Sequence, residues 1–382
     1  MELMRPMKLG GGQLVFGQGA LRHLERLRGT RALIVVSGGR FRRAGVTDAI
    51  AKHLAAAGME SSVYEDVARD PDFACVRRGA AEMARRRPDV IVALGGGSVL
   101  DAAKAMWVLY EHPEIETFAQ LERCHNNVPA LRQKAYLVAI PTTSGTASEA
   151  SRSMVITDVD THRKVGVSDA QLVPDVAILE PELTYSLPAG LTAETGMDAL
   201  THALEALVSL RANFISDVFA EKAAALILAS LADACAHPES YEARNAMQLG
   251  SYLAGLAFSN VSLGICHSIA HALGGEFGLP HGLLNAIALP YVLAFNREQP
   301  GAAEKFRALE HSLGLGPLSE EVRELNQRLG VPALARLIDE AAFFEKLPAL
   351  ARTAQGDGCT KTNPRPTDEE TMRGLMEQIY RG

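Results

Sequence analysis

The chain has 382 residues, of which 47% are hydrophobic and 22% charged, and its formal net charge is -7. A chain of this length is too long for one simple hydrophobic core and long enough for two domains. Its composition is that of an ordinary globular protein. The negative net charge argues against a broad nucleic-acid-binding surface, although the local cluster of Arg40, Arg42 and Arg43 can serve one small anion.

Features read along the whole chain indicate a cytoplasmic protein with no membrane partner. The first nine residues hold no long apolar segment, so we expect no signal peptide. The longest apolar stretch, 223–236, is too short to cross a bilayer and is interrupted by Asp233. The five cysteines, at 75, 124, 235, 266 and 359, have no paired spacing, which favours a reducing compartment.

Short apolar runs alternate with helical patterns in the first half of the chain. In order, 32–36, 61–64, 89–94, 135–140 and 176–179 predict strands, and 46–57, 73–85 and 99–110 predict helices. Strands that alternate with helices imply a parallel sheet covered on both faces. We therefore predict an α/β domain over residues 1–185.

After Pro181 the pattern changes to long helical periodicity. The helical segments are 193–209, 216–231, 243–258, 283–295, 302–313 and 368–380, the last with Thr367 as its N-cap. Residues 186–382 are therefore predicted to form an all-α domain. The crevice between two domains is the usual place for a ligand, and we expect the site there.

A glycine-rich turn, Gly95-Gly96-Gly97-Ser98, lies directly between a predicted strand and a predicted helix. Glycines let the backbone approach an anion closely, and a helix N-terminus offers unpaired N–H groups to it. Ser98 and Asp101 also have the spacing of a capping box. The turn is thus a candidate phosphate cradle, with a plain tight turn as the alternative.

Hydroxyl residues cluster after the strand at 135–140. Thr142, Thr143 and Thr146 surround Gly145 in Pro141-Thr-Thr-Ser-Gly-Thr-Ala-Ser-Glu149. At the carboxyl end of a strand, such residues suit a lining for phosphate and ribose groups. A Ser/Thr-rich surface turn is the alternative interpretation.

Candidate metal ligands occur in two segments of the helical half. Asp198 and His202 are four residues apart on a predicted helix and so project from one face. Three of the chain's 11 histidines, His267, His271 and His281, fall in the stretch 264–282. Imidazoles with one carboxylate suit Fe2+ or Zn2+, and less often Mn, Co or Ni. Cys266 is the one cysteine close enough in sequence to join them.

These motifs together resemble the iron-containing (group III) alcohol dehydrogenases. The matching segments, in order, are 95–104, 140–149, 196–203, 267–271 with 280–282, and the tail 359–366. The segment 107–113 resembles the alcohol dehydrogenase half of bifunctional aldehyde–alcohol dehydrogenases. The resemblance covers nearly the whole chain and implies the fold shared by dehydroquinate synthase and iron-containing alcohol dehydrogenases, with a dinucleotide-binding domain followed by a helical metal-binding domain.

The resemblance also implies a role for each site residue. Asp198, His202, His267 and His281 would hold the metal, and His271 would lie near the nicotinamide and the substrate and relay a proton. The cofactor would be bound by Gly38, Gly39, Arg40, Asp70, Gly95, Gly96, Gly97, Ser98, Asp101, Thr142, Thr143, Thr146 and Lys164. Phe258, Asn260, Phe277 and Cys359 are candidate pocket liners. We expect a homodimer or a larger homo-oligomer.

The cofactor preference is predicted from one departure from the family pattern. NAD-preferring relatives end the first strand in an acidic residue, whereas here the strand runs into Ser37-Gly-Gly-Arg-Phe-Arg-Arg43. Small residues and arginines accommodate a 2′-phosphate that an acid would repel. NADP(H) is therefore expected over NAD(H), with a solvated basic turn as the alternative.

The predicted activity is hydride transfer between NAD(P)H and a small aldehyde or primary alcohol. A bound divalent metal would polarise the carbonyl oxygen. The alternatives are another reaction on the same fold, such as that of glycerol dehydrogenase or dehydroquinate synthase, and a non-catalytic scaffold derived from such an enzyme.

Overall fold

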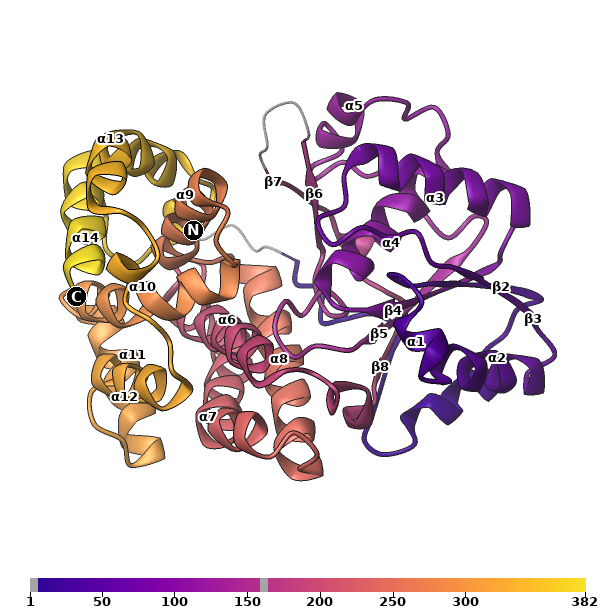
Figure 1. Cartoon of the computed structure of the whole chain (residues 1–382), viewed down its shortest axis with the longest axis horizontal. Coiled ribbons are helices and arrows are strands. Elements are labelled where there is room, and N and C mark those ends of the chain that lie inside the picture. The colour runs from indigo at the N-terminus through magenta and orange to yellow at the C-terminus, as the bar shows by residue number, and fades with distance from the viewer. Residues whose placement is uncertain (1–5, 159–163) are drawn as a thin grey trace. The chain divides into compact units, whose positions relative to one another are not determined.

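The computed structural model describes residues 6–158 and 164–382, so part of the N-terminal segment predicted to lack a signal peptide lies outside the described residues. The chain forms two compact units (Figure 1). The first comprises residues up to Thr143 together with Ala147–Tyr185. The second comprises Ser144–Thr146 and Ser186–Gly382.

The first unit contains a six-stranded sheet whose pairings are all parallel. The strand order is β1 (Gln13–Phe16), β8 (Val176–Leu179), β5 (Tyr136–Pro141), β4 (Val90–Gly95), β2 (Arg31–Val35) and β3 (Glu60–Tyr64). The predicted parallel sheet and its five predicted strands are confirmed. The edge strand β1 was missed, because it has only four residues, of which three are apolar, and they are mostly exposed.

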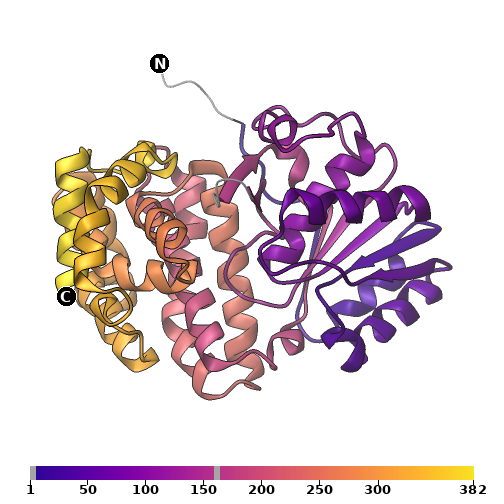
Figure 2. The same cartoon turned by 45° about the horizontal axis from the view of Figure 1, so that its top comes forward.

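Side chains along the strands alternate between two buried faces. Leu33 and Val35 pack in the core formed with α3 (Phe73–Arg86) and α4 (Gly97–Glu111). Ile34 and Val36 pack in a separate core with α2 (Val46–Ala56) on the other face. Figure 2 shows helices on both sides of this sheet. Burial on both faces explains why the strands are continuous apolar runs.

Shorter elements complete the first unit. They are η1 (Ala20–Arg26), α1 (Arg40–Arg43), α5 (Phe118–Glu122), β6 (Ser153–Thr157), β7 (Lys164–Ser168), η2 (Ala170–Leu172) and η3 (Pro181–Thr184). Strands β6 and β7 pair antiparallel in a small sheet of their own, which the sequence analysis did not predict.

The second unit contains only helices among its described residues, as predicted. They are α6 (Ala189–Val208), α7 (Phe214–Ala236), α8 (Tyr241–Val261), α9 (Ile265–Phe277), α10 (His281–Asn296), α11 (Pro300–Leu313), α12 (Leu318–Leu329), η4 (Leu334–Arg336), α13 (Glu340–Gly356), η5 (Cys359–Thr362) and α14 (Glu369–Arg381). All six predicted helices are present, whereas α9, α12 and α13 were not predicted. One large apolar core joins residues from α6 to α14.

The predicted N-cap of the last helix was wrong by one residue. Asp368 caps α14, because its carboxylate accepts a hydrogen bond from the Thr371 N–H at 2.8 Å. The Thr367 hydroxyl instead donates to Gln355 Oε1 at 2.8 Å. Both residue types favour the N-cap, and only the hydrogen bond distinguishes them.

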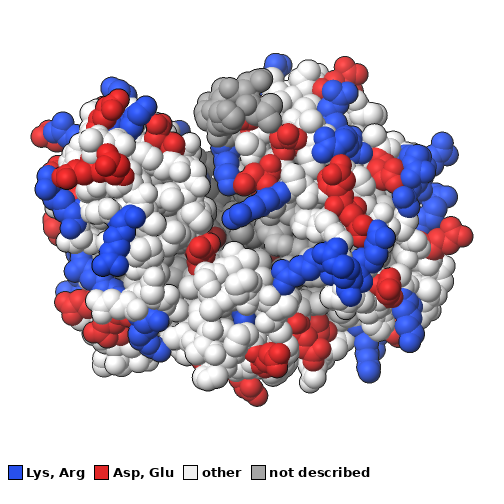
Figure 3. All heavy atoms as spheres, in the orientation of Figure 1, with Lys and Arg blue, Asp and Glu red and all other residues white. Residues whose placement is uncertain are grey.

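The described surface and helix lengths give two further observations. Basic and acidic side chains are interspersed over the face shown in Figure 3. In the described part of the chain, no single helix is long and apolar enough to cross a membrane. The helices α8 and α9 reach that length and composition only as a pair bent by 98°.

A buried charged cluster lies between α4 and β6. Lys104 has no exposed surface, and its Nζ donates to the carbonyls of Ser151 and Ser153 at 2.9 and 2.8 Å. Burial lowers the pKa of Lys104 to about 8 and raises that of the nearby Glu149 to about 7. Burial also raises the pKa of Asp101, so two carboxyl groups share one ammonium ion away from water.

This cluster makes stability depend on pH through Glu149. The folded protein holds the Glu149 proton up to a pKa of about 7, whereas an ordinary glutamate loses it at 4.5. Raising the pH through this window therefore removes stability, by roughly 3 kcal/mol at most. Glutamine does not ionise, so we expect Glu149→Gln to cancel this loss. Urea unfolding should then give the variant a higher free energy of unfolding than the wild type at about pH 8, but not at about pH 5. A parallel pH dependence in both proteins would contradict this expectation.

Candidate metal and cofactor sites

Three helices of the second unit bring the four predicted metal ligands together. Asp198 and His202 lie on α6, His267 on α9, and His281 is the first residue of α10. The Nε2 atoms of His202, His267 and His281 lie 4.0, 3.7 and 3.5 Å from Asp198 Oδ1. Asp198, His202 and His267 are buried, and the His281 side chain is 34% exposed. The four donors thus form a cage with one partly open side.

A glycine permits the close approach of two of these helices. A Cβ atom on Gly282, next to His281, would lie 2.2 Å from the backbone oxygen of Glu194 on α6. Real Cβ atoms do not come so close to backbone, so the contact between α10 and α6 requires glycine here. This contact brings His281 to within reach of Asp198.

A buried glutamate orients one of the candidate ligands. Glu205 Oε2 lies 2.6 Å from His267 Nδ1, and Glu205 Oε1 accepts from the Cys266 N–H at 2.7 Å. With Nδ1 engaged by Glu205, Nε2 is the nitrogen of His267 that faces the cage and can bind a metal ion. A carboxylate behind a metal-binding histidine commonly has this role.

The electrostatics of the cage suit a cation. Burial would raise the pKa of Asp198, but the three surrounding histidines lower it well below its ordinary range. Burial lowers the pKa of His202 to about 4 and also lowers that of His281. Burial opposes protonation of His267 too, but contact with Asp198 and Glu205 raises its pKa to about 9. The cage therefore offers an ionised carboxylate and two neutral imidazoles near neutral pH.

An asparagine lies among the ligand atoms. Asn285 is fully buried; its Nδ2 donates to Asp198 Oδ1 at 2.8 Å and lies 3.2 and 3.1 Å from Nε2 of His267 and His281. The amide nitrogen thus contacts the same three atoms that a metal ion would contact. An ion held by these atoms requires the amide to turn aside.

The donor set fits a divalent metal ion. The ligand atoms of Asp198, His267 and His281 all lie within 4.8 Å of one another. One carboxylate and several imidazoles are ligands that Fe2+ and Zn2+ both accept. Cys266 is not part of the set, because its thiol donates to the Asn285 carbonyl at 3.6 Å.

His271 lies beside the cage. It is one turn after His267 on α9, and its ring stacks on that of His281 with centroids 5.1 Å apart. Its side chain is 43% exposed, and its Nδ1 lies 2.9 Å from Asp357 Oδ2. An imidazole held in this way presents its other nitrogen away from Asp357.

The candidate pocket liners have different surroundings. The Phe258 ring stacks on His202 with centroids 4.3 Å apart, so it borders the cage. Asn260 donates from Nδ2 to the Leu256 carbonyl of its own helix at 2.8 Å. Phe277 packs against the large core. The structure thus brings Phe258 to the cage.

The glycine-rich turn forms the carboxyl end of β4 and the start of α4. Gly95 is the last residue of β4, Gly96 is the N-cap, and α4 begins at Gly97. The predicted capping box of Ser98 and Asp101 is wrong, because α4 has no side-chain cap. Asp101 instead accepts from the Ser148 hydroxyl at 2.6 Å and from the Val155 N–H at 3.0 Å. No side chain therefore blocks the first N–H groups of α4 from an anion, although the Val99 N–H already donates to the Gly96 carbonyl at 3.0 Å.

Two loops meet at the point where the sheet changes its winding direction. From β2 the chain goes to β3 on one side, and from β4 it goes to β5 on the other. Ligands of parallel sheets bind at the carboxyl ends of such strands. Because Val35 of β2 pairs with Ala93 of β4, the turn of Gly38 and Gly39 lies beside the glycine-rich turn. Gly38 has φ 58°, which favours glycine there.

The loop after β2 is less basic than its sequence suggests. Arg42 forms an ion pair with Glu65, which follows β3. Ser37 forms a backbone bridge with Asp66. No acid ends β2 itself, as noted from the sequence, but the fold brings acids from the neighbouring strand. Of the three arginines, Arg42 is therefore already paired.

The remaining predicted cofactor residues lie in several places. The Thr142 N–H donates to the Gly95 carbonyl at 3.0 Å, and Thr143 lies against Gly96. Lys164, at the start of β7, pairs with Asp70 at 2.9 Å, and both side chains are more than half exposed. Thr146 is exposed and belongs to the second unit.

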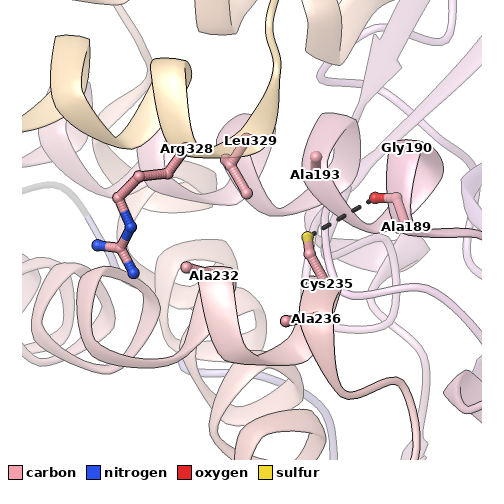
Figure 4. A pocket seen from close by; sticks show the side chains of 8 residues that line it. All are labelled: Ala189, Gly190, Ala193, Ala232, Cys235, Ala236, Arg328 and Leu329. Carbon is pink, nitrogen blue, oxygen red and sulfur yellow. Dashed lines mark hydrogen bonds between the residues drawn. The ribbon is translucent and has the colours of Figure 1, made fainter.

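A separate cavity lies between α6, α7 and α12 of the second unit (Figure 4). It has a volume of ≈ 260 Å³ and is lined by Ala189, Gly190, Ala193, Ala232, Cys235, Ala236, Arg328 and Leu329. The Cys235 thiol donates to the Ala189 carbonyl at 3.6 Å. None of the predicted site residues lines this cavity.

Asp357, Glu205 and Asn285 were missed by the sequence analysis. Glu205 follows His202 by three residues and Asn285 follows His281 by four, so both lie on the ligand-bearing faces of their helices. Helical spacing could therefore have indicated them. Nothing in the sequence pairs Asp357 with His271, which is 86 residues away.

Known proteins are similar to the chain along nearly its whole length. The NADPH-dependent butanol dehydrogenase of Clostridium saccharobutylicum is 41% identical over 97% of this chain and 96% of its own. The 1-propanol dehydrogenase of Salmonella typhimurium is 38% identical over 96% and 98%. The solved iron-containing alcohol dehydrogenase of Thermococcus thioreducens superposes with a TM-score of 0.90 at 33% identity, covering 99% of this chain and 100% of its own.

Two family models match the two halves of the chain. Residues 11–181 match the model for iron-containing alcohol dehydrogenase. Residues 192–380 match the model for the C-terminal part of the Fe-containing alcohol dehydrogenase family. The chain therefore belongs to the iron-containing alcohol dehydrogenase family.

Proposed function

We propose that this alcohol dehydrogenase interconverts small aldehydes and primary alcohols with NADP(H), using a divalent metal ion held by Asp198, His202, His267 and His281. The observation that carries the proposal is the buried cage in which these four side chains converge. A butanol dehydrogenase and a 1-propanol dehydrogenase, both similar to this chain over nearly its whole length, support the substrate class.

The chain's residues prepare the reacting carbonyl and its surroundings. Bound in the cage, the metal supplies a Lewis acid, and the reduced nicotinamide supplies the hydride. Glu205 holds the Nδ1 proton of His267, so Nε2 is the nitrogen that would give up its proton and bind the metal, and Asp198 stays ionised. His271, which Asp357 holds beside His281, would exchange a proton with the substrate oxygen.

We assign dinucleotide binding to residues 1–185 and metal and substrate binding to residues 186–382. The glycine-rich turn at the start of α4 would hold the pyrophosphate, because its first-turn N–H groups have no side-chain cap. Thr142 and Thr143 lie beside this turn. Gly38, Gly39 and Arg40 would contact the adenosine ribose at the adjacent strand end.

An assay with several aldehydes and alcohols, each with NADPH and NADH, tests the activity. The protein is loaded anaerobically with Fe2+ or Zn2+, and its metal content is measured. We expect reversible turnover with simple aldehydes and about one tightly held ion per chain in the cage. Turnover with glycerol but not with simple aldehydes would favour the glycerol dehydrogenase alternative, and neither metal nor turnover would indicate a scaffold.

The preference for NADP(H) is tested at Gly38. An added Cβ there meets nothing within 4 Å, so a side chain fits, and φ 58° strains aspartate and asparagine equally. We expect Gly38→Asp to lower kcat/KM with NADPH, relative to NADH, by about tenfold compared with Gly38→Asn, because its charge repels the 2′-phosphate. Equal cofactor ratios in the two variants, or a wild type that prefers NADH, would overturn the assignment.

A further inference from the structure

A second cluster of metal-ligating groups lies next to the cage. It consists of His271 on α9, Asp357 at the end of α13 and Cys359 at the start of η5, and it is distinct from the cage residues. The three ligand atoms, a nitrogen, an oxygen and a sulfur, all lie within 4.8 Å of one another. Two ligands of one tetrahedral Zn2+ lie about 3.3 to 4 Å apart, so small rotations of these side chains suffice.

The local structure already orders this cluster. Asp357 Oδ2 faces His271 Nδ1 at 2.9 Å, and Asp357 Oδ1 accepts from the Cys359 N–H at 2.7 Å. The Ser268 hydroxyl also lies 3.4 Å from Oδ1. A carboxylate held by several donors has little freedom to lose when it binds an ion. Asp357 thus fixes the positions of both other ligands.

The chemistry of the three groups selects a thiophilic ion. Thiolate, imidazole and carboxylate are all zinc ligands, and the thiolate disfavours Mg2+ or Ca2+. Burial, with Asp357 alongside, raises the pKa of the Cys359 thiol well above 9.0, so the thiol carries its proton before the ion arrives. Binding forms the metal–sulfur bond and releases that proton to water. The 43% exposure of His271 leaves a route for the ion and a fourth position for water.

We propose that His271, Asp357 and Cys359 form a second metal site, which takes Zn2+ or a similar thiophilic divalent ion and inhibits the enzyme when filled. Inhibition rests on the proposed function, because an imidazole whose Nδ1 binds Zn2+ is a much weaker base at Nε2 and exchanges protons poorly with the substrate. Binding itself does not rest on that function. The site would make the enzyme sensitive to the free zinc level, separately from the ion in the cage.

Cobalt titration of the metal-free protein tests the binding. The cage contains no sulfur ligand, so a thiolate-to-cobalt charge-transfer band in the near ultraviolet reports Cys359. We expect two equivalents of Co2+ to bind, one of them with this band. Cys359→Ser should abolish the band and weaken one equivalent by at least about tenfold, and Asp357→Asn should shift the band to higher cobalt concentrations.

Cys235→Ser is the matched control. Cys235 is also a half-buried cysteine of the second unit, and it belongs to neither ligand cluster found among the described residues (Figure 4). This variant should keep both equivalents and the band. A single equivalent in the wild type, two equivalents without a charge-transfer band, or a band that survives Cys359→Ser would each overturn the second site.

Inhibition is measured separately on the Fe2+-loaded enzyme. Added Zn2+ should inhibit the wild type and Cys235→Ser at a concentration at least about tenfold lower than Cys359→Ser. Exchange of the ion in the cage affects all three proteins alike, so the difference reports the second site. Equal inhibition of all three would refute the inhibitory role. Absence of turnover before zinc is added would instead refute the proposed function, while the cobalt result would stand.

Discussion

Replacing His267 with alanine is expected to abolish turnover together with metal binding. His267 is buried and contributes Nε2 at 3.7 Å from Asp198 Oδ1, so its loss leaves the cage with three donors and a cavity. Lewis-acid assistance supplies several kcal/mol of transition-state stabilisation, and we expect kcat/KM to fall by at least about a thousandfold. His281→Ala should behave in the same way, because it removes a second cage nitrogen.

Metal content and activity are measured on the same purified samples. His237→Ala is the control, because this histidine lies in the same unit, its side chain is 72% exposed, and it pairs with Asp233 at the surface. That variant should keep both metal and activity. If His267→Ala and His281→Ala both retain stoichiometric metal and turnover, the four-ligand assignment is wrong.

The convergence of the four candidate ligands was predicted partly from local geometry and partly from the resemblance to the family. Asp198 and His202 are one helical turn apart, so their sequence spacing already places them on one face. His267 and His281 also stand out, because histidine is a common metal ligand and the chain has only 11 histidines. What spacing cannot show is the approach of α10 to α6, which depends on the absence of a side chain at Gly282.

The errors at helix starts have a common physical cause. Ser98 and Asp101 have capping-box spacing, and Thr367 is a good N-cap residue, but Asp101 and Thr367 form other hydrogen bonds in the fold. Asp101 binds Ser148 and Val155, and Thr367 binds Gln355. Local capping competes with tertiary partners, and the sequence near the helix does not reveal those partners.

The partners of the loop after β2 were also beyond sequence reasoning. Glu65 is 23 residues from Arg42, and only the parallel pairing of β2 with β3 brings the two strand ends together. The resulting ion pair removes one arginine from the set available to a 2′-phosphate. The prediction of NADP(H) therefore depends more on the small residues Gly38 and Gly39 than on the number of arginines.

Glu205→Gln is expected to weaken metal binding by about 10- to 100-fold without removing any ligand. The carboxylate accepts two N–H groups, from Cys266 on Oε1 and from His267 Nδ1 on Oε2. An amide has only one oxygen. If that oxygen faces Cys266, the amide N–H faces Nδ1 and favours the His267 tautomer whose proton is on Nε2, which blocks the metal. If it faces His267, the glutamine amide N–H points at the Cys266 backbone N–H. The two donors repel each other, which strains the start of α9.

Competition with a chromophoric chelator measures the affinity, and the free energy of unfolding is measured on the metal-free protein. Glu111→Gln is the control, because Glu111 is another buried glutamate and it accepts backbone N–H groups in the first unit. We expect Glu111→Gln to lower stability with unchanged metal affinity. Unchanged affinity in Glu205→Gln would show that the Glu205 carboxylate does not control the His267 tautomer. If Glu205→Gln alone weakens the affinity, Glu205 helps to determine whether the cage holds its ion, although it lies in none of the sequence motifs.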